Sequence, residues 1–272
     1  MKLLSGSELV DFIKERQAKQ VRNLKQAHHI APNLAIVRCD EGNKIIDTYM
    51  RLKRAYGDDI GVTLEVHDET PETAMSSIQA LNEREDVHGI IVQFPVFPTE
   101  LGDALVEAVD AAKDVDGLST HSSFDPATPT AILWLLAGYN VTPENVAIVG
   151  RGRLVGAPLE KMLLNSGVSV KSYDIESAHE LQARLLEAKI IVTATGQPGL
   201  ITSDMVAQNA VVVDAGTASE GGVIRGDVAA DVRERDDLTI TPEKGGVGPL
   251  TVAALFDNVI LSARRRATAA SS

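Results

Sequence analysis

The sequence has little cysteine and no long apolar run. The single cysteine, Cys39, rules out an internal disulfide and suits a reducing compartment. Apolar runs such as residues 131–137 are far shorter than the ~20 residues that a membrane span needs, and the N-terminus MKLLSGSELVDF lacks the apolar core of a signal peptide. We therefore expect a cytoplasmic protein that does not bind a membrane.

Basic residues and clustered histidines are also scarce. The chain has 26 Lys and Arg against 38 Asp and Glu, a net charge of −12, whereas a nucleic-acid surface needs a basic field. The only close pair among the scattered histidines is His28 and His29, and adjacent residues on a helix do not share a face. We therefore expect neither a nucleic-acid partner nor a metal site.

Short apolar runs alternate with amphipathic segments along most of the chain. This alternation predicts an α/β protein whose strands are parallel. The amphipathic segment at 70–84 begins with Thr70 as a cap and Pro71 in the first helical position. Strands are expected at 34–37, 61–67, 89–94, 146–149, 168–173, 190–194 and 210–214. Helices are expected at 5–26, 43–56, 70–84, 100–112, 130–136 and 250–262, with a loop at 238–249.

A polar stretch without periodicity, residues 114–126, interrupts this alternation. A chain of 272 residues is near the size at which cores divide, so we place a domain change here. The prediction is a first α/β domain of residues 1–122 and 251–272 and a Rossmann-like, doubly wound domain of residues 123–250. The last helix would return to the first domain.

A glycine-rich turn, NVAIVGRGRLVGAP at 145–158, follows a buried strand and leads into a helix. Glycines here let the backbone approach the pyrophosphate of a dinucleotide, and the helix N-terminus attracts its charge. Asp174 ends the next strand, near the ~20-residue offset of a ribose-binding carboxylate. The alternatives are a tight turn without a ligand and, for Asp174, a helix N-cap formed with residues 175–177.

A second set of residues has the composition of a catalytic site. Tyr49 and Lys53 are four residues apart on a predicted helix, so they share a face, and burial would lower the lysine pKa toward neutrality. An exposed lysine beside a half-buried tyrosine is the alternative. Gln93 is the lone amide at the end of an apolar strand, where parallel sheets face their ligands. KDVDG at 113–117 places carboxylates at the predicted domain boundary.

These motifs occur in the order found in one enzyme family. The motifs are Tyr49-x3-Lys53, GIIVQFP at 89–95, KDVDG, PATP at 126–129, GRGRLVGAP at 150–158 and GGVGPLT at 245–251. The chain resembles bifunctional methylenetetrahydrofolate dehydrogenase/cyclohydrolase over nearly its whole length. The resemblance implies that hydride passes from 5,10-methylenetetrahydrofolate to NAD or NADP. The methenyl product is then hydrolysed to 10-formyltetrahydrofolate in one-carbon metabolism.

The resemblance also implies roles for individual residues. Lys53 would be the general acid/base, Gln93 would hydrogen-bond and tune it, Tyr49 would pack on the pterin ring, and Asp116 would bind the polar pterin edge. The remaining substrate-binding candidates are Pro95, Gly245, Gly246, Pro249 and Thr251. The cofactor-binding candidates are Gly150, Arg151, Gly152, Arg153, Val155, Gly156, Pro158, Asp174, Thr195 and Gly216.

The sequence departs from the family pattern at several positions. On the substrate side it has Ile46 for a serine, PATP for PCTP, and Glu243-Lys244 before the GGVGP motif. On the cofactor side Gly152 replaces a serine and Asp174 a histidine. We expect NAD to be preferred over NADP, because Asp174 would repel a 2′-phosphate and Gly152 lacks a hydroxyl to bind it. Arg151 and Arg153 oppose this expectation, since arginine binds phosphate well.

The resemblance further implies a homodimer that acts on tetrahydrofolate derivatives. One alternative is a dehydrogenase of the same fold without cyclohydrolase activity. Another is a non-catalytic folate-binding relative, which would be expected to have lost Lys53 or Gln93. Both residues are present.

Overall fold

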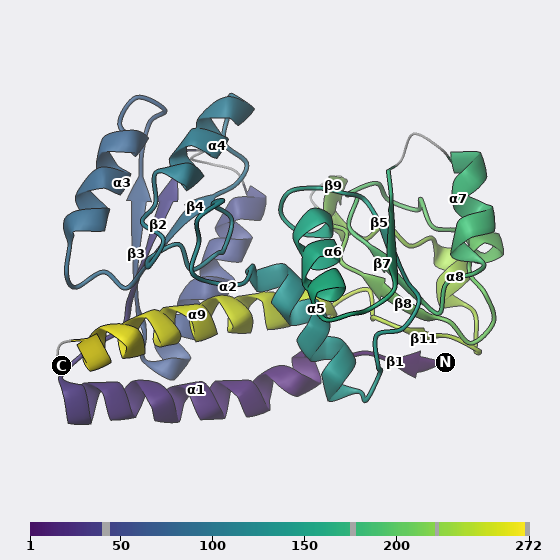
Figure 1. The fold of residues 1–272 in the computed structure, drawn as a ribbon, viewed down its shortest axis with the longest axis horizontal. Helices are drawn as coiled ribbons and strands as arrows, with labels where there is room; N and C mark the ends of the chain where they lie inside the picture. Colours follow the sequence, from purple (N-terminus) through teal and green to yellow (C-terminus); the bar gives the residue numbers. More distant parts are fainter. Residues whose placement is uncertain (40–43, 175–177, 221–222, 270–272) are drawn as a thin grey trace. The chain divides into compact units, whose positions relative to one another are not determined.

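The structure is a computed structural model and describes residues 1–39, 44–174, 178–220 and 223–269 (Figure 1). Two compact units make up the chain. One comprises Asp11–Ala127 and Val252–Ser272, and the other Met1–Val10 and Thr128–Thr251. We call them the three-stranded unit and the six-stranded unit, after their main sheets. The predicted α/β class with parallel strands is confirmed, since both main sheets are parallel throughout.

The three-stranded unit is built on the sheet order β3-β2-β4. Its centre is β2, in which Leu34, Ala35, Ile36 and Val37 are fully buried, as expected of a parallel strand covered on both faces. The strands are β2 (Asn33–Arg38), β3 (Thr63–Asp68) and β4 (Gly89–Gln93). The helices with all or most of their length in this unit are α1 (Gly6–His28), α2 (Lys44–Ile60), α3 (Ala74–Glu83), α4 (Thr99–Glu107) and α9 (Val247–Ala269).

The segment around Asp114 runs alongside β4. The backbone N–H of Ile90 donates to the carbonyl of Lys113 at 2.8 Å, and Ile90 forms a parallel bridge with Asp114. Because the segment is parallel to β4, residue 116 is carried toward the carboxyl end of that strand. Asn258 of α9 donates to the Val115 carbonyl at 2.9 Å and holds the segment from the other side.

The six-stranded unit has the strand order β1-β11-β8-β7-β5-β6. After β5 the chain adds β6 on one side and β7 on the other, so the topological switch point lies between β5 and β7. The strands of the sheet are β1 (Lys2–Leu3), β5 (Val146–Val149), β6 (Val170–Tyr173), β7 (Ile190–Thr193), β8 (Val211–Asp214) and β11 (Thr239–Ile240). The other elements are α5 (Ala127–Gly138), α6 (Gly156–Asn165), α7 (Ala178–Leu185), a 3-10 turn (Ser203–Met205), the hairpin of β9 (Ala218–Glu220) and β10 (Val223–Arg225), and α8 (Ala230–Arg233).

Several predicted boundaries differ from the structure, and two of the differences have a clear physical reason. Helix α3 begins at Ala74 rather than with Thr70 as its cap, because the Thr70 carbonyl accepts the N–H groups of Thr73 and Ala74 and forms a separate turn. Helix α9 begins at Val247, inside the expected loop. Pro249 is tolerated there because the first N–H groups of a helix have no intrahelical partner.

The first residues of the chain lie in the six-stranded unit, whereas we expected them in the first domain. The N–H groups of Lys2 and Leu4 donate to the carbonyls of Leu238 and Ile240 at 2.9 Å, which adds β1 to the sheet beside β11. Two-residue strands have too short a pattern to be found from sequence. The later unit boundary, after Ala127, lies five residues beyond the predicted one at 122/123.

Helix α9 is long and apolar enough to cross a membrane by length and composition alone. The core helix of a globular protein has the same properties, and 61% of the apolar window is buried inside the protein. Phe256, for example, is fully buried and stacks on Tyr56 of α2 with ring centroids 5.2 Å apart. We interpret α9 as a core helix.

Candidate active site

Helix α2, which carries Tyr49 and Lys53, is fixed at both ends. Near its start, Asp47 forms an ion pair with Arg38 at 2.8 Å, and Arg38, the last residue of β2, also binds Asp68. Near its end, the Tyr56 hydroxyl donates to Gln17 of α1 at 2.7 Å. Lys53 lies between these anchors and is therefore held in a defined position against the sheet.

Lys53 and Gln93 meet at the carboxyl end of β4. The Lys53 Nζ donates to the Gln93 Oε1 at 2.8 Å, so the expected hydrogen bond is present. Gln93 Nε2 donates in turn to the Phe94 carbonyl at 2.8 Å, which fixes the amide with its oxygen toward the lysine. Tyr49 is half-buried and lies one turn before Lys53 on the same face of α2.

Asp116 is the acidic partner of this lysine. Burial lowers the pKa of Lys53 from its usual value, and the negative charge of Asp116 opposes the shift. Burial raises the pKa of Asp116, and the charge of Lys53 opposes that shift. The result is an ammonium group that loses its proton more easily than a surface lysine, with a carboxylate close enough to interact with it.

Lys113 and Asp114 hold the turn that carries Asp116. The Lys113 ammonium donates to the carbonyls of Leu81, Asn82 and Arg84 at 3.0, 2.5 and 2.7 Å, which caps the C-terminus of α3. The Asp114 carboxylate accepts the backbone N–H groups of Gly117 and Ser119 at 3.2 and 2.8 Å. Our sequence reasoning missed both roles, although the charged residues that flank Asp116 were visible in the motif.

The glycine-rich turn has the shape of a phosphate cradle. Gly150 follows β5 with φ +95°, and a Cβ there would lie 2.7 Å from the Ala194 carbonyl oxygen. A Cβ on Gly156, at the start of α6, would overlap the Gly150 carbonyl, whereas one on Gly152 would meet only open space. A nicotinamide dinucleotide fits this arrangement, because close backbone approach and the N-terminus of α6 favour a pyrophosphate.

The other cofactor candidates lie at the same edge of the sheet. Asp174, Thr195 and Gly216 follow the neighbouring strands β6, β7 and β8, whose carboxyl ends are level with that of β5. Asp174 is exposed, and Thr195 and Gly216 are half-buried. Residues 175–177, which would form the alternative helix start after Asp174, lie outside the described residues. Arg153, Val155 and Pro158 are half-buried along the turn and the start of α6.

Arg151 is exposed and pairs with Glu160 of α6 at 3.4 Å. This pairing engages one of the two arginines that could otherwise bind a 2′-phosphate.

The remaining substrate candidates lie in two places. Gly245, Gly246, Pro249 and Thr251 belong to the six-stranded unit rather than to the unit of Lys53. Gly245 has φ +80°, and its carbonyl accepts the Ser7 N–H at 3.0 Å. Pro95 lies in the three-stranded unit, is exposed, and follows a cis peptide bond after Phe94.

Metal chemistry has no candidate ligand set within the described part of the chain, where no three His, Cys, Asp or Glu side chains cluster.

Two family models match the chain and cover most of it. The catalytic domain of tetrahydrofolate dehydrogenase/cyclohydrolase matches residues 4–116, and the NAD(P)-binding domain of the same family matches residues 126–267. This chain belongs to the tetrahydrofolate dehydrogenase/cyclohydrolase family. The predicted fold of two α/β domains, one of them nucleotide-binding, and the predicted bifunctional activity in one-carbon metabolism are confirmed.

Individual relatives align over nearly their full length. The bifunctional protein FolD of Nitratiruptor is 34% identical, and the alignment covers 98% of this chain and 99% of that protein. The crystal structure of the bifunctional enzyme FolD of Campylobacter jejuni has a TM-score of 0.90 at 33% identity, with 98% and 99% of the two chains covered. The Trypanosoma brucei enzyme, solved with NADP and an inhibitor, has a TM-score of 0.89 at 27% identity and 97% coverage of both chains.

Proposed function

We propose that Lys53 is the general acid/base of the cyclohydrolase step and that Gln93 and Asp116 set its position and protonation. The observation that carries this proposal is the 2.8 Å hydrogen bond from Lys53 to Gln93 at the carboxyl end of β4, beside Asp116. In parallel sheets ligands bind at that edge. A lysine with a lowered pKa suits proton transfer near neutral pH.

The proposed chemistry needs one proton acceptor that can also donate. The amine of Lys53 takes a proton from water as the water oxygen bonds to the methenyl carbon. The resulting ammonium gives a proton to N5 as the bond from that carbon to N5 breaks, which leaves the formyl group on N10. The added hydroxyl loses its proton to solvent, so the net products are 10-formyltetrahydrofolate and one proton.

Binding of the pterin is assigned to the neighbours of Lys53. A carboxylate such as Asp116 can accept two parallel hydrogen bonds from the amidine-like edge of the ring, and the flat ring suits packing on Tyr49. The family resemblance also assigns substrate binding to Pro95, Gly245, Gly246, Pro249 and Thr251. Asp116→Asn should therefore weaken folate binding, measured as a rise in KM for both activities.

We also propose that the dehydrogenase prefers NAD over NADP. When bound, the nicotinamide accepts the hydride removed from the methylene carbon. Asp174 is exposed at the end of β6, where a carboxylate would bind the ribose hydroxyls and repel a 2′-phosphate. The ion pair of Arg151 with Glu160 supports the same preference, because it holds the guanidinium on α6.

The cofactor proposal is tested by kcat/KM with NAD and with NADP, followed through the absorbance of the methenyl product. Wild type should favour NAD, and Asp174→Ser should shift the ratio toward NADP. Glu160→Gln should shift it in the same direction, because Arg151 is released from its partner. A wild-type preference for NADP, or a ratio unchanged in Asp174→Ser, contradicts the assignment.

The family resemblance also leads us to propose a cytoplasmic homodimer without a metal. Size-exclusion chromatography with light scattering tests the dimer: the expected mass is twice the 29.0 kDa of one chain. Metal analysis of the active enzyme tests the proposal that it needs no metal, and the active enzyme should contain no stoichiometric metal ion.

A further inference from the structure

We infer that Asp227 is a positioning residue for the dehydrogenase: its buried carboxylate holds the backbone of the loop after β7 in the shape that the cofactor site needs. Asp227 lies after the β9–β10 hairpin and is 0% exposed. It was not among the residues singled out from the sequence. This inference rests on the proposed cofactor site, to which Thr195 belongs.

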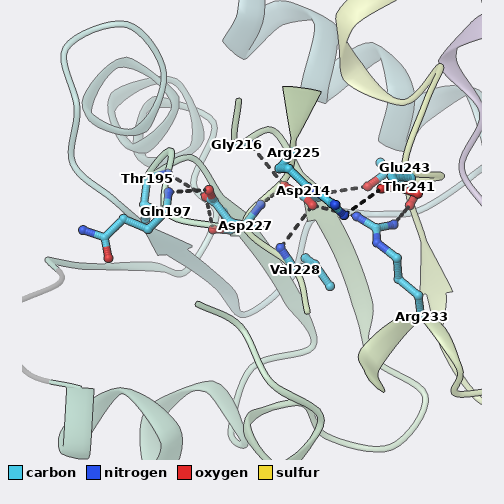
Figure 2. A network of polar contacts seen from close by, with 11 residues as sticks. Thr195, Gln197, Asp214, Gly216, Arg225, Asp227, Val228, Arg233, Thr241 and Glu243 are labelled. Carbon is cyan, nitrogen blue, oxygen red and sulfur yellow. Dashed lines mark hydrogen bonds and ion pairs between the residues drawn. The ribbon is translucent and has the colours of Figure 1, made fainter. Parts of the chain in front are cut away.

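The carboxylate of Asp227 is bound from β7 and the loop that follows it. Its Oδ2 accepts the hydroxyl of Thr193 at 2.6 Å and the N–H of Thr195 at 2.7 Å, and its Oδ1 accepts the N–H of Gln197 at 2.9 Å. Figure 2 shows the side chain between the Thr195–Gln197 backbone and Asp214. An ionised carboxylate is costly to bury unless its oxygens are hydrogen-bonded, so these donors are held firmly.

The backbone of Asp227 is itself fixed. Its carbonyl accepts the Ile201 N–H at 3.0 Å, and its N–H donates to the Asp214 carboxylate at 3.0 Å. Asp214 accepts the Val228 N–H as well and pairs with Arg233 at 2.7 Å, while Arg233 also donates to the Thr241 carbonyl at 2.9 Å. Figure 2 shows the contacts of Asp227, Asp214 and Arg233 as a network that extends from Thr195 to Thr241. The Asp227 carboxylate is therefore a rigid support and not a mobile surface group.

The supported loop adjoins the glycine-rich turn. β7 and β5 flank the topological switch point, where α/β sheets bind ligands. The Ala194 N–H donates to the Val149 carbonyl at 2.9 Å, and the Ala194 carbonyl lies so close to Gly150 that a side chain there would collide. A displacement of Thr195 would therefore deform the wall of the turn.

Gly216, one of the cofactor candidates, has a steric reason to be glycine. A Cβ at this position would overlap the Asp227 carboxylate, and a Cβ on Gly226 would overlap that of Asp214. The two carboxylates are thus packed directly against backbone, which leaves no room for them to shift and still satisfy their donors.

The two activities of the enzyme separate this role from a general contribution to stability. The cyclohydrolase reaction, assayed on methenyltetrahydrofolate without cofactor, depends on Lys53 and not on the loop after β7. A change confined to that loop should therefore affect only the dehydrogenase. A change that unfolds the chain should affect both activities alike.

The test is Asp227→Asn, assayed for both activities, for binding of NAD and NADP by calorimetry, and for thermal stability. An amide has one acceptor oxygen, so at least one of the three donors loses its partner. Because hydrogen bonds to charged groups contribute roughly 1.5–3 kcal/mol, which corresponds to about a tenfold change or more, KM and Kd for the cofactor should rise by at least about tenfold. Cyclohydrolase activity should match wild type. The matched control is Asp236→Asn, because Asp236 is an exposed aspartate nearby in the sequence. This control should change neither cofactor affinity nor cyclohydrolase activity.

Thr193→Val is the second variant, in case Asp227→Asn does not fold. It removes a single hydroxyl and keeps a β-branched side chain in the strand, and cofactor KM should again rise while hydrolysis is unchanged. Cofactor affinity equal to wild type in both variants overturns the inference. The inference is also overturned if both enzymatic activities fall by the same factor and thermal stability falls with them. If Asp174→Ser alters cofactor affinity but Asp227→Asn does not, the cofactor site stands and only the role of Asp227 is wrong.

Discussion

Two lysines of the three-stranded unit, the half-buried Lys53 and the buried Lys113, show how the same side chain can suit chemistry or structure. Burial lowers the pKa of both Lys53 and Lys113. Lys113 donates to three carbonyls at the end of α3, so its protons are all engaged. Among the described residues Lys53 has one hydrogen-bond acceptor, the amide of Gln93, with Asp116 close enough to interact.

The comparison teaches that burial alone does not mark a catalytic lysine. What distinguishes Lys53 among the described residues is its single hydrogen-bond acceptor, the amide of Gln93, which suits the proton transfer proposed for it. Lys113 instead donates to backbone carbonyls at the end of α3, and these hydrogen bonds favour its charged form.

The largest expected effect is that of Lys53→Met on hydrolysis. The substitution removes the ammonium but keeps an apolar stem, and positioned proton transfer is worth roughly 10²–10⁴-fold. Hydrolysis of methenyltetrahydrofolate, followed by loss of its absorbance, should fall by that factor while urea unfolding is nearly unchanged. Hydrolysis near the wild-type rate would refute the assignment of Lys53.

Lys113→Met is the structural counterpart and should chiefly affect stability. It leaves the carbonyls of Leu81, Asn82 and Arg84 without their donor, which should lower the free energy of unfolding by roughly 2–4 kcal/mol. Urea unfolding measures this loss. An unchanged unfolding midpoint would mean that water replaces the ammonium group without loss of stability. Lys113 would then have no structural role to set against the proposed catalytic role of Lys53.

His88 sharpens the comparison because it is buried near Lys113. Burial lowers its pKa from 6.5 to about 4, and Arg266 and Lys113 add to the shift. The unfolded chain therefore takes up a proton between pH 6.5 and 4 that the folded protein does not, so stability falls as pH decreases through this window. At one pKa unit per about 1.4 kcal/mol, lowering the pH from ~7 to ~5 should remove about 2 kcal/mol through His88.

His88→Gln should abolish this part of the pH dependence, measured as the difference in the free energy of unfolding between neutral and mildly acidic buffers. His28→Gln, an exposed site on α1, is the control and should retain the wild-type dependence. Equal pH dependence in wild type and His88→Gln would show that the buried imidazole is not responsible.

The smallest expected effect is that of Gln93→Ala. Loss of one hydrogen bond to a charged group should slow hydrolysis by roughly tenfold. The amide oxygen favours the ammonium form, so its removal should lower the Lys53 pKa further and move the corresponding limb of the pH–rate profile to lower pH. Gln79→Ala, exposed on α3, is the control. A profile identical to wild type would leave Gln93 without the tuning role.

Much of the fold could be predicted because buried parallel strands are short apolar runs with clear ends. The strand of residues 146–149 was predicted with its observed bounds, and the fully buried centre of β2 lies in the run 34–37. Elements held by distant partners were missed. β1 and β11 have only two residues each and form because β1 pairs with β11 and β11 pairs with β8.

The candidate site residues show the same division between local pattern and tertiary contact. Lys53, Gln93 and Asp116 were singled out from local features, namely a helix face shared with Tyr49, an amide at the end of an apolar strand, and carboxylates at a turn. The roles expected of them came from the family resemblance. Asp227 breaks no pattern, since an aspartate after a hairpin is ordinary in sequence. Its importance comes from donors at residues 193–197, about thirty positions earlier in the chain.

The sequence by itself determined the family, the alternation of strands and helices, and the residues at the ends of strands, because these depend on local patterns and on motifs in a fixed order. Only the tertiary structure decided that Lys53 faces Gln93, that Lys113 caps α3, and that Asp227 supports the loop after β7. The physical reason is that hydrogen-bond partners of buried charges are chosen by proximity in space. A charge removed from water must find its partners wherever the fold brings them, and sequence distance does not limit which ones they are.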